Sequence, residues 1–338
     1  MAVSTAPWFY GAFVIACLLS GGIVAAIFRF GWTDPASRIR EWGMRLATVL
    51  LSLLFVLAAL EGFIRYVALP GATLGIGGRL WAQRYMQPMN SLGFRGPEPA
   101  TEKTAARRLV IVGDSFAAGF GLRNYEDAFP SRLQEQLGTD WEVIVLARPG
   151  WNLGEYIVAL DSHRDLQPDM VMLSLFVNDI ESASGNRVDR QFAEVGAPGG
   201  VVGFLVHGFA LASMAYTHYI LPRIASDYWD AIEQCYTDPD IVEEYHRQLG
   251  EFANITHELN SELMVVVWPI FASMNADAPA YRIPVEFFRS RNVPVVHLGQ
   301  ELGHLPAESL AINAVDLHPN EVASKMVAGI LAEQIASH

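Results

Sequence analysis

The sequence has little charge and little cysteine. Only 17% of its 338 residues are charged, against about 25% in typical soluble domains, and 51% are hydrophobic. Such a composition excludes an intrinsically disordered or collagen-like chain and argues against a wholly soluble protein. The two cysteines, Cys17 and Cys235, are too few for a disulfide framework or a cysteine zinc site.

Basic residues are also scarce. The chain carries 23 Lys and Arg against 36 Asp and Glu, which gives a net charge of −13. Because a nucleic-acid surface needs clustered Lys and Arg to neutralise phosphates, we expect no nucleic-acid partner. The histidines lack the paired spacing of metal ligands, so we expect no metal and no other cofactor.

What the sequence does contain is a long apolar run near its start. Trp8–Phe28 comprises 21 uncharged residues, and about 20 residues cross the hydrocarbon core of a bilayer. A cleaved signal peptide is the rival interpretation. It would begin with basic residues, however, and residues 1–7 carry no charged side chain. We therefore predict a membrane span at about residues 8–28.

A second apolar run, Leu46–Leu60, is shorter and continues to Val67. Glu61 and Arg65 interrupt it, but they are four residues apart and can pair on one helix face near the membrane interface. We predict a second span at about residues 46–67. Together, the two runs form a predicted two-helix transmembrane anchor over residues 1–69.

Arginines set the expected orientation of this anchor. Arg29, Arg38, Arg40 and Arg45 lie between the two apolar runs, whereas no basic residue precedes the first. By the positive-inside rule, the connecting loop is predicted to be cytoplasmic and both termini to lie outside the cytoplasm.

A third apolar stretch, Val201–Pro222, also lacks formal charge. It contains His207, His218 and several glycine and proline residues, which make it a poor spanning helix. We predict a buried or membrane-surface helix there instead.

The remainder of the chain has an alternating α/β pattern. A connector at residues 70–104 precedes a domain at residues 105–338, in which short apolar runs alternate with longer segments of mixed polarity. This order predicts a parallel sheet covered by helices on both faces, with ligands at the carboxyl ends of the strands. The predicted strands are Arg108–Gly113, Glu142–Leu146, Met170–Leu175, Leu263–Trp268 and Pro294–Leu298, and the predicted helices include Phe129–Leu137, Glu155–Leu166, Val242–Asn260 and Glu321–Ala336.

Chemically useful residues follow the first three predicted strands and precede the last helix. Ser115 lies in a Gly-Asp-Ser-Phe turn, Gly150 follows the second strand, and Asn178 follows the third. His318 stands before the last helix, two residues after Asp316. Each has an ordinary explanation when taken alone, as a helix cap, a loop glycine or a surface histidine.

In this order, the residues resemble the SGNH/GDSL hydrolase superfamily. Ser115, Gly150, Asn178 and His318 fall on its four signature positions. The resemblance implies a flavodoxin-like three-layer α/β/α sandwich with a five-stranded parallel sheet, and hydrolysis or transfer of an ester acyl group. It implies that Ser115 is the nucleophile, His318 its base and Asp316 the ring orienter. The implied oxyanion hole comprises the backbone N–H groups of Ser115 and Gly150 and the side-chain amide of Asn178.

Two positions depart from the superfamily pattern. The acid commonly precedes the histidine by three residues, where this chain has Val315, so Asp316 is one position closer. If Asp316 does not reach the ring, a backbone carbonyl would orient His318. Phe176 stands where glycine is usual, two residues before Asn178.

The resemblance also bears on location and topology. The connector segment Asn90–Gly96 is similar to that of membrane-anchored bacterial members. Together with the two predicted spans and their orientation, this likeness predicts a multi-pass protein of the bacterial inner membrane with a periplasmic catalytic domain. If Val201–Pro222 crossed the bilayer once, Ser115 and His318 would lie on opposite sides. The catalytic interpretation therefore predicts that this stretch does not span.

The leading hypothesis is a membrane-anchored serine esterase that deacylates an O-acylated envelope carbohydrate or lipid. An O-acyltransferase of the same chemistry is the close alternative. A non-catalytic subunit of a membrane complex, which retains the fold and binds partner proteins, is the alternative from a different class. A dinucleotide-binding protein is excluded, because the turn after the first strand lacks the Gly-x-Gly-x-x-Gly pattern.

Overall fold

A five-stranded parallel sheet forms the centre of the protein. The computed structural model describes residues 38–68, 75–100, 102–103, 105–185, 188, 199–271, 277–313 and 316–337. Its strands are β1 (Arg107–Gly113), β2 (Trp141–Ala147), β3 (Met170–Leu175), β4 (Glu262–Val267) and β5 (Val295–His297), in the spatial order β2-β1-β3-β4-β5. This is the flavodoxin-like order, so the predicted fold class is confirmed.

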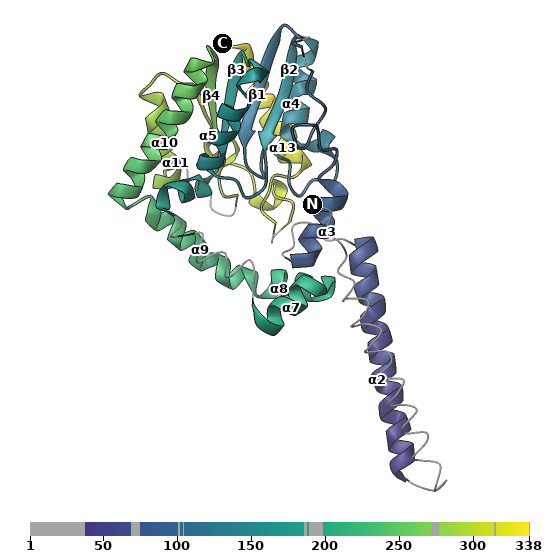
Figure 1. Ribbon diagram of the computed structural model, residues 1–338. Coiled ribbons are helices and arrows are strands. Elements are labelled where there is room, and N and C mark those ends of the chain that lie inside the picture. The colour runs from purple at the N-terminus through teal and green to yellow at the C-terminus, as the bar shows by residue number, and fades with distance from the viewer. Residues whose placement is uncertain are drawn as a thin grey trace.

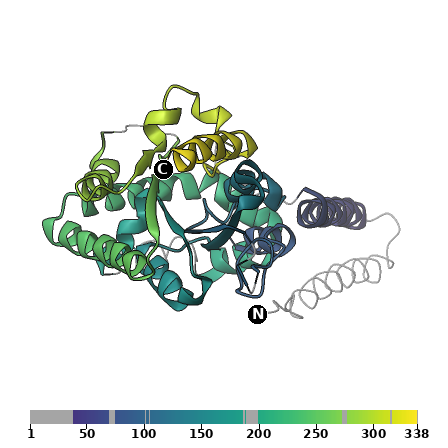
Figure 2. The same ribbon diagram turned by 90° about the horizontal axis from the view of Figure 1, so that it is seen from above.

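The strands are apolar on both faces because helices cover both sides of the sheet (Figure 2). In β1, Leu109 and Ile111 pack toward one face and Val110 and Val112 toward the other, and all four are fully buried. The first face is covered by α4 (Phe129–Leu137), α12 (Leu298–Leu302) and α13 (Glu321–Ala336), and the second by α5 (Leu153–Ser162), α10 (Pro239–Glu258) and α11 (Pro279–Arg289).

Most predicted helices have nearly their predicted bounds, and α4 and α13 have the same ones. Two helices, α11 and α9 (Leu221–Cys235), were not predicted from the sequence, and the apolar residues of each line only one of its sides. Short 3₁₀ turns complete the body: η2 (Tyr125–Asp127), η3 (Gly138–Asp140), η4 (Arg164–Leu166), η5 (Val177–Ser184) and η6 (Ala307–Ser309).

A long helix extends away from this body (Figure 1). α2 (Arg38–Phe63) continues into a π-helical turn, η1 (Ile64–Ala68). Its segment Glu41–Val67 is long and apolar enough to cross a membrane. This segment contains the second predicted span, whereas the first, at residues 8–28, lies outside the described residues.

Arg38, Arg40 and Arg45 are not in a loop, contrary to the expectation from the sequence. They lie in the first turns of α2. Arginine is a good helix former, and Arg45 pairs with Glu41 one turn earlier, so the helix begins before its apolar segment does.

The third apolar stretch forms two helices instead of one. α7 (Gly200–Gly208) and α8 (Ala210–Tyr219) meet at Phe209, and the helical axis turns there by 116°. α8 packs on α3 (Gly75–Tyr85), an unpredicted helix within the connector, where the Gly77 N–H donates to Ser213 Oγ at 3.3 Å.

Candidate active site

Ser115 lies in a tight turn directly after β1. The Phe116 N–H donates to Asp114 Oδ1 at 2.8 Å, and the Phe120 N–H donates to the Ser115 carbonyl at 2.9 Å. Gly113 must be small here, because a Cβ would lie 2.9 Å from the Cβ atoms of Ala117 and Ser174. The sequence therefore closes the turn with glycine and places the serine hydroxyl at the carboxyl edge of the sheet.

The structure brings Ser115, His318 and Asp316 into one chain of contacts. His318 Nε2 lies 2.8 Å from Ser115 Oγ, and His318 Nδ1 lies 2.6 Å from Asp316 Oδ1. With Nδ1–H donated to the carboxylate, Nε2 has a lone pair facing the hydroxyl. Asp316 thus reaches the ring from two residues away and occupies the place that a backbone carbonyl would otherwise take.

Local contacts hold Asp316 in this position. Its own N–H donates to Asn313 Oδ1 at 2.9 Å, and its Oδ1 also accepts the backbone N–H of His318 at 3.2 Å. The side chain is buried beside Gly121, where a Cβ would lie 3.2 Å from Oδ2. A buried carboxylate with this partner favours one orientation and one tautomer of the imidazole.

The order of strands in the sheet places the residues expected for the oxyanion hole on either side of Ser115. β2 and β3 are the two neighbours of β1, so Gly150 after β2 and Asn178 after β3 lie at the same edge on either side of the serine turn. Gly150 has φ of +82°, which suits glycine, and it is exposed. Asn178 is the second residue of η5, and its Oδ1 is buried without a hydrogen-bond partner among the described residues.

Two aromatic rings lie against the histidine, a feature that was not predicted from the sequence. The rings of Phe116 and Phe120 lie 5.2 and 5.1 Å from that of His318. Phe176 stacks on Phe116 at 4.4 Å and also meets Trp229 of α9. The departure from glycine at position 176 therefore adds an apolar wall beside the serine turn.

A family model described as the GDSL-like lipase/acylhydrolase family matches residues 111–325, well over half of the chain. The matched region contains Ser115, Gly150, Asn178, Asp316 and His318. The chain belongs to this family. As a GDSL-like acylhydrolase it is a serine ester hydrolase, as the sequence resemblance predicted.

Several solved structures are similar to this GDSL-like acylhydrolase. The crystal structure of TesA is 14% identical with a TM-score of 0.41, covering 66% of this chain and 94% of TesA. A catalytic mutant of Axe2, an acetylxylan esterase from Geobacillus stearothermophilus, is 14% identical with a TM-score of 0.43, covering 68% of this chain and 94% of Axe2. A carbohydrate acetylesterase family member from Sinorhizobium meliloti is 16% identical with a TM-score of 0.37, covering 68% and 97%. No curated protein matches the chain.

Two buried carboxyl groups shape the loops of the acylhydrolase site. Asp114 accepts the Phe116 N–H, and Asp179 accepts the Phe176 N–H at 2.7 Å. Burial raises the pKa of Asp114 to about 6. Burial, and then the nearby charge of Asp114, raises the pKa of Asp179 well above its usual value. The two carboxyl groups accept hydrogen bonds from the serine turn and from the residue just before η5, and so hold both segments in place.

Arg95, in the connector, links the serine turn and the residues that follow it to the end of α3 through hydrogen bonds. Its side chain is 1% exposed and donates to the carbonyls of Gly119 at 2.6 Å and Leu122 at 2.9 Å, and to that of Tyr85 at the end of α3 at 2.7 Å. Burial lowers the pKa of Arg95 to about 10, so the guanidinium is charged at neutral pH. The connector segment Asn90–Gly96 therefore helps to hold the serine turn in place.

Replacing Arg95 with methionine is expected to lower the free energy of unfolding by at least about 3 kcal/mol, because buried carbonyls lose a charged donor. Urea unfolding in detergent, followed by tryptophan fluorescence, measures this. Arg289→Met, an exposed arginine on α11, is the control and should change stability by less than about 0.5 kcal/mol. Equal midpoints for the two variants would contradict the assigned role.

Replacing Asn178 with alanine is expected to lower kcat about 10²–10³-fold, the usual loss when one oxyanion donor is removed. Initial rates on a p-nitrophenyl ester measure this. The matched control is Asn254→Ala, an exposed asparagine on α10, which should keep wild-type turnover. Wild-type turnover in Asn178→Ala would remove this amide from the oxyanion hole.

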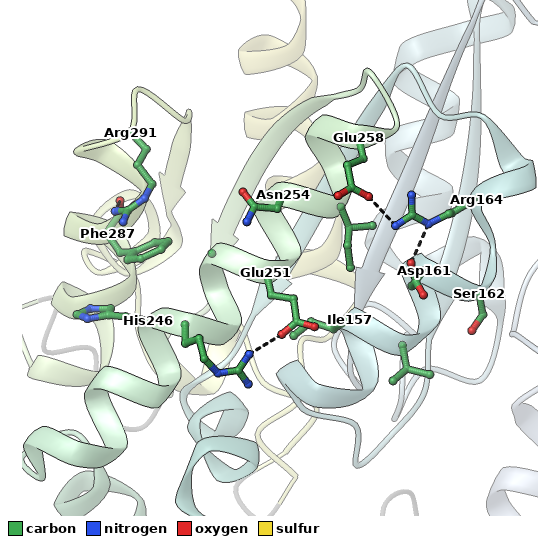
Figure 3. A pocket seen from close by; sticks show the side chains of 14 residues that line it. Ile157, Asp161, Ser162, Arg164, His246, Glu251, Asn254, Glu258, Phe287 and Arg291 are labelled. Atoms are coloured by element: carbon green, nitrogen blue, oxygen red, sulfur yellow. Dashed lines mark hydrogen bonds and ion pairs between the residues drawn. The ribbon is translucent and has the colours of Figure 1, made fainter.

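A groove of about 720 Å³ between α5 and α10 lies apart from this chemistry (Figure 3). Its charged residues largely neutralise one another: Arg164 pairs with Glu258 at 2.8 Å, and Arg247 with Glu251 at 2.9 Å. No residue of the proposed catalytic set lines it.

Proposed function

We propose that the chain is a membrane-anchored serine esterase whose nucleophile is Ser115. The observation that carries the proposal is the contact chain from Ser115 through His318 to Asp316. His318 takes the proton of Ser115 Oγ as the oxygen attacks the ester carbonyl, and Asp316 stabilises the imidazolium that forms.

Attack of the Ser115 oxygen on the ester carbonyl forms a tetrahedral intermediate, which then collapses to an acyl-enzyme. The N–H groups of Ser115 and Gly150 and the amide of Asn178 stabilise the oxyanion. His318 returns its proton to the leaving alcohol, which departs and leaves an acyl ester on Ser115. A water molecule, deprotonated by His318, attacks this ester, and His318 then returns the proton to Ser115 Oγ as the carboxylic acid is released.

We place the enzyme in a bacterial inner membrane, anchored through residues 8–67. The apolar segment Glu41–Val67 supports the second span of this anchor. With the arginine-bearing segment in the cytoplasm, the catalytic domain is periplasmic, and its substrate is an O-acylated carbohydrate or lipid of the envelope.

A fluorophosphonate probe tests the esterase function on the full chain in detergent. Covalent labelling together with release of free acid from an O-acetylated sugar supports a hydrolase. Transfer of the acyl group to an added sugar hydroxyl in place of water would identify an O-acyltransferase. Absence of labelling in folded protein would support the non-catalytic membrane subunit instead.

A further inference from the structure

Exposed apolar side chains gather in one region of the described chain. Apart from Met89, Val158 and Val322, every large exposed hydrophobic residue there lies on α2 and η1, on α7 or at the end of α8. α7 contains no acidic residue, lysine or arginine. The large apolar side chains that it exposes are those of Val201, Val202, Phe204 and Leu205, of which Val201 is 75% exposed.

A buried polar contact fixes α7 and α8 to the end of α2. Glu61 accepts the backbone N–H groups of Ala210 and Leu211, both at 2.8 Å, at the start of α8. Arg65 pairs with Glu61 at 2.8 Å and donates to the Gly208 carbonyl at the same distance. Glu61 and Arg65 belong to the apolar segment Glu41–Val67, so the bend between α7 and α8 lies at the depth where that segment ends.

The same layer of helices contacts the catalytic centre through α3. Trp81 of α3 is 1% exposed and meets Phe120 at 4.9 Å between ring centroids, and Phe120 in turn meets His318. α3 packs on both α7 and α8. One short path of packed rings and helices therefore connects the histidine to the apolar face of α7.

A second path runs through α9, which continues from α8. Trp229 of α9 meets Phe176 beside the serine turn, and the Tyr228 hydroxyl donates to Glu181 of η5 at 2.6 Å. Figure 1 shows α7, α8 and α9 on the side of the body from which α2 extends. The catalytic centre is thus bordered by helices that lead to the end of the apolar segment.

We propose that the exposed face of α7 lies in the lipid headgroup layer of the bilayer that α2 enters, and that it holds the catalytic centre at the membrane surface. This rests on the proposed anchoring. An apolar helix face that lies in the interface plane binds lipid through its buried area. The attachment of α7 to the end of the apolar segment selects the bilayer as the partner. Esters presented at the bilayer surface are then the preferred substrates.

Lipid-borne quenching tests the contact in full-length protein reconstituted into phosphatidylethanolamine–phosphatidylglycerol vesicles. Bimane is attached at Phe204→Cys, with Val158→Cys on α5 as the exposed control and the labelled parent chain as the blank for its own cysteines. Lipids with a spin label near the headgroup should remove about half of the signal at position 204 and little at 158. Absence of quenching at 204 in vesicle-bound protein would overturn the proposal. It would mean that a protein partner, and not lipid, covers the exposed face of α7.

A charge on the same face tests the consequence for activity. Phe204→Glu should lower hydrolysis of a vesicle-borne ester lipid about 10-fold while leaving hydrolysis of soluble p-nitrophenyl acetate unchanged, and Val158→Glu should change neither. Equal rates of the two variants on the lipid ester would overturn the membrane-surface role. If Phe204→Glu does not fold, the cysteine quenching still decides. Wild-type protein that hydrolyses neither ester but is quenched at 204 would refute the esterase function and leave the membrane contact standing.

Discussion

Replacing Ser115 with alanine is expected to lower ester turnover by about 10⁴-fold or more and to abolish fluorophosphonate labelling, because the acyl-enzyme can no longer form. Labelling and p-nitrophenyl ester hydrolysis are measured on the same detergent-purified samples. The loss should appear in kcat, since the alanine leaves the apolar walls of the site in place.

The control for this experiment is Ser162→Ala. Ser162 is an exposed serine at the end of α5 and should keep both labelling and turnover. Persistent labelling of Ser115→Ala would show that another residue is the nucleophile and would refute the proposed mechanism.

Replacing Asp316 with asparagine is expected to lower kcat by about 10³–10⁴-fold. The carboxylate accepts a hydrogen bond from the Nδ1–H of His318, which leaves Nε2 as the acceptor for the Ser115 hydroxyl. An asparagine amide would donate to Nδ1 instead, and Nε2 would then carry the hydrogen and face the hydroxyl with no lone pair. Single-turnover acylation by a p-nitrophenyl ester measures the loss.

Asp161→Asn is the matched control, because Asp161 is an exposed carboxylate on α5 with a surface ion pair to Arg164. Its turnover should equal that of the wild type. A small effect of Asp316→Asn would mean that the ring keeps its tautomer by other contacts, and it would make Asp316 a structural residue only.

The fold and the local positions of the site residues were predictable from the sequence. A parallel strand that is covered on both faces must be apolar along its length, so a run such as Met170–Leu175 can be recognised as a buried strand. Ser115, Gly150 and Asn178 follow their strands directly, and the rule that ligands meet the carboxyl ends of strands places them at one edge. The long apolar segment of α2 was likewise recognisable, since bilayer thickness sets its length.

The aromatic wall and the support of the serine turn were not predictable. In the sequence pattern, Phe176 is only a departure from the usual glycine, and Arg95 is only one residue of the connector. Their roles depend on which distant groups the fold brings to them: Trp229 in one case and the carbonyls of the serine turn in the other. A buried cation is tolerated only where such acceptors converge, and a linear pattern does not show that convergence.

The α/β architecture, the family and the order of the signature residues can be recognised in the linear chain, because they follow from burial periodicity and from short motifs. Three contacts are visible only in the folded protein: Asp316 reaches His318, His318 reaches a serine 203 positions away, and Arg65 donates to a carbonyl 143 positions away. Contact distances of about 3 Å depend on how whole helices and loops pack, and that packing is a property of the complete fold.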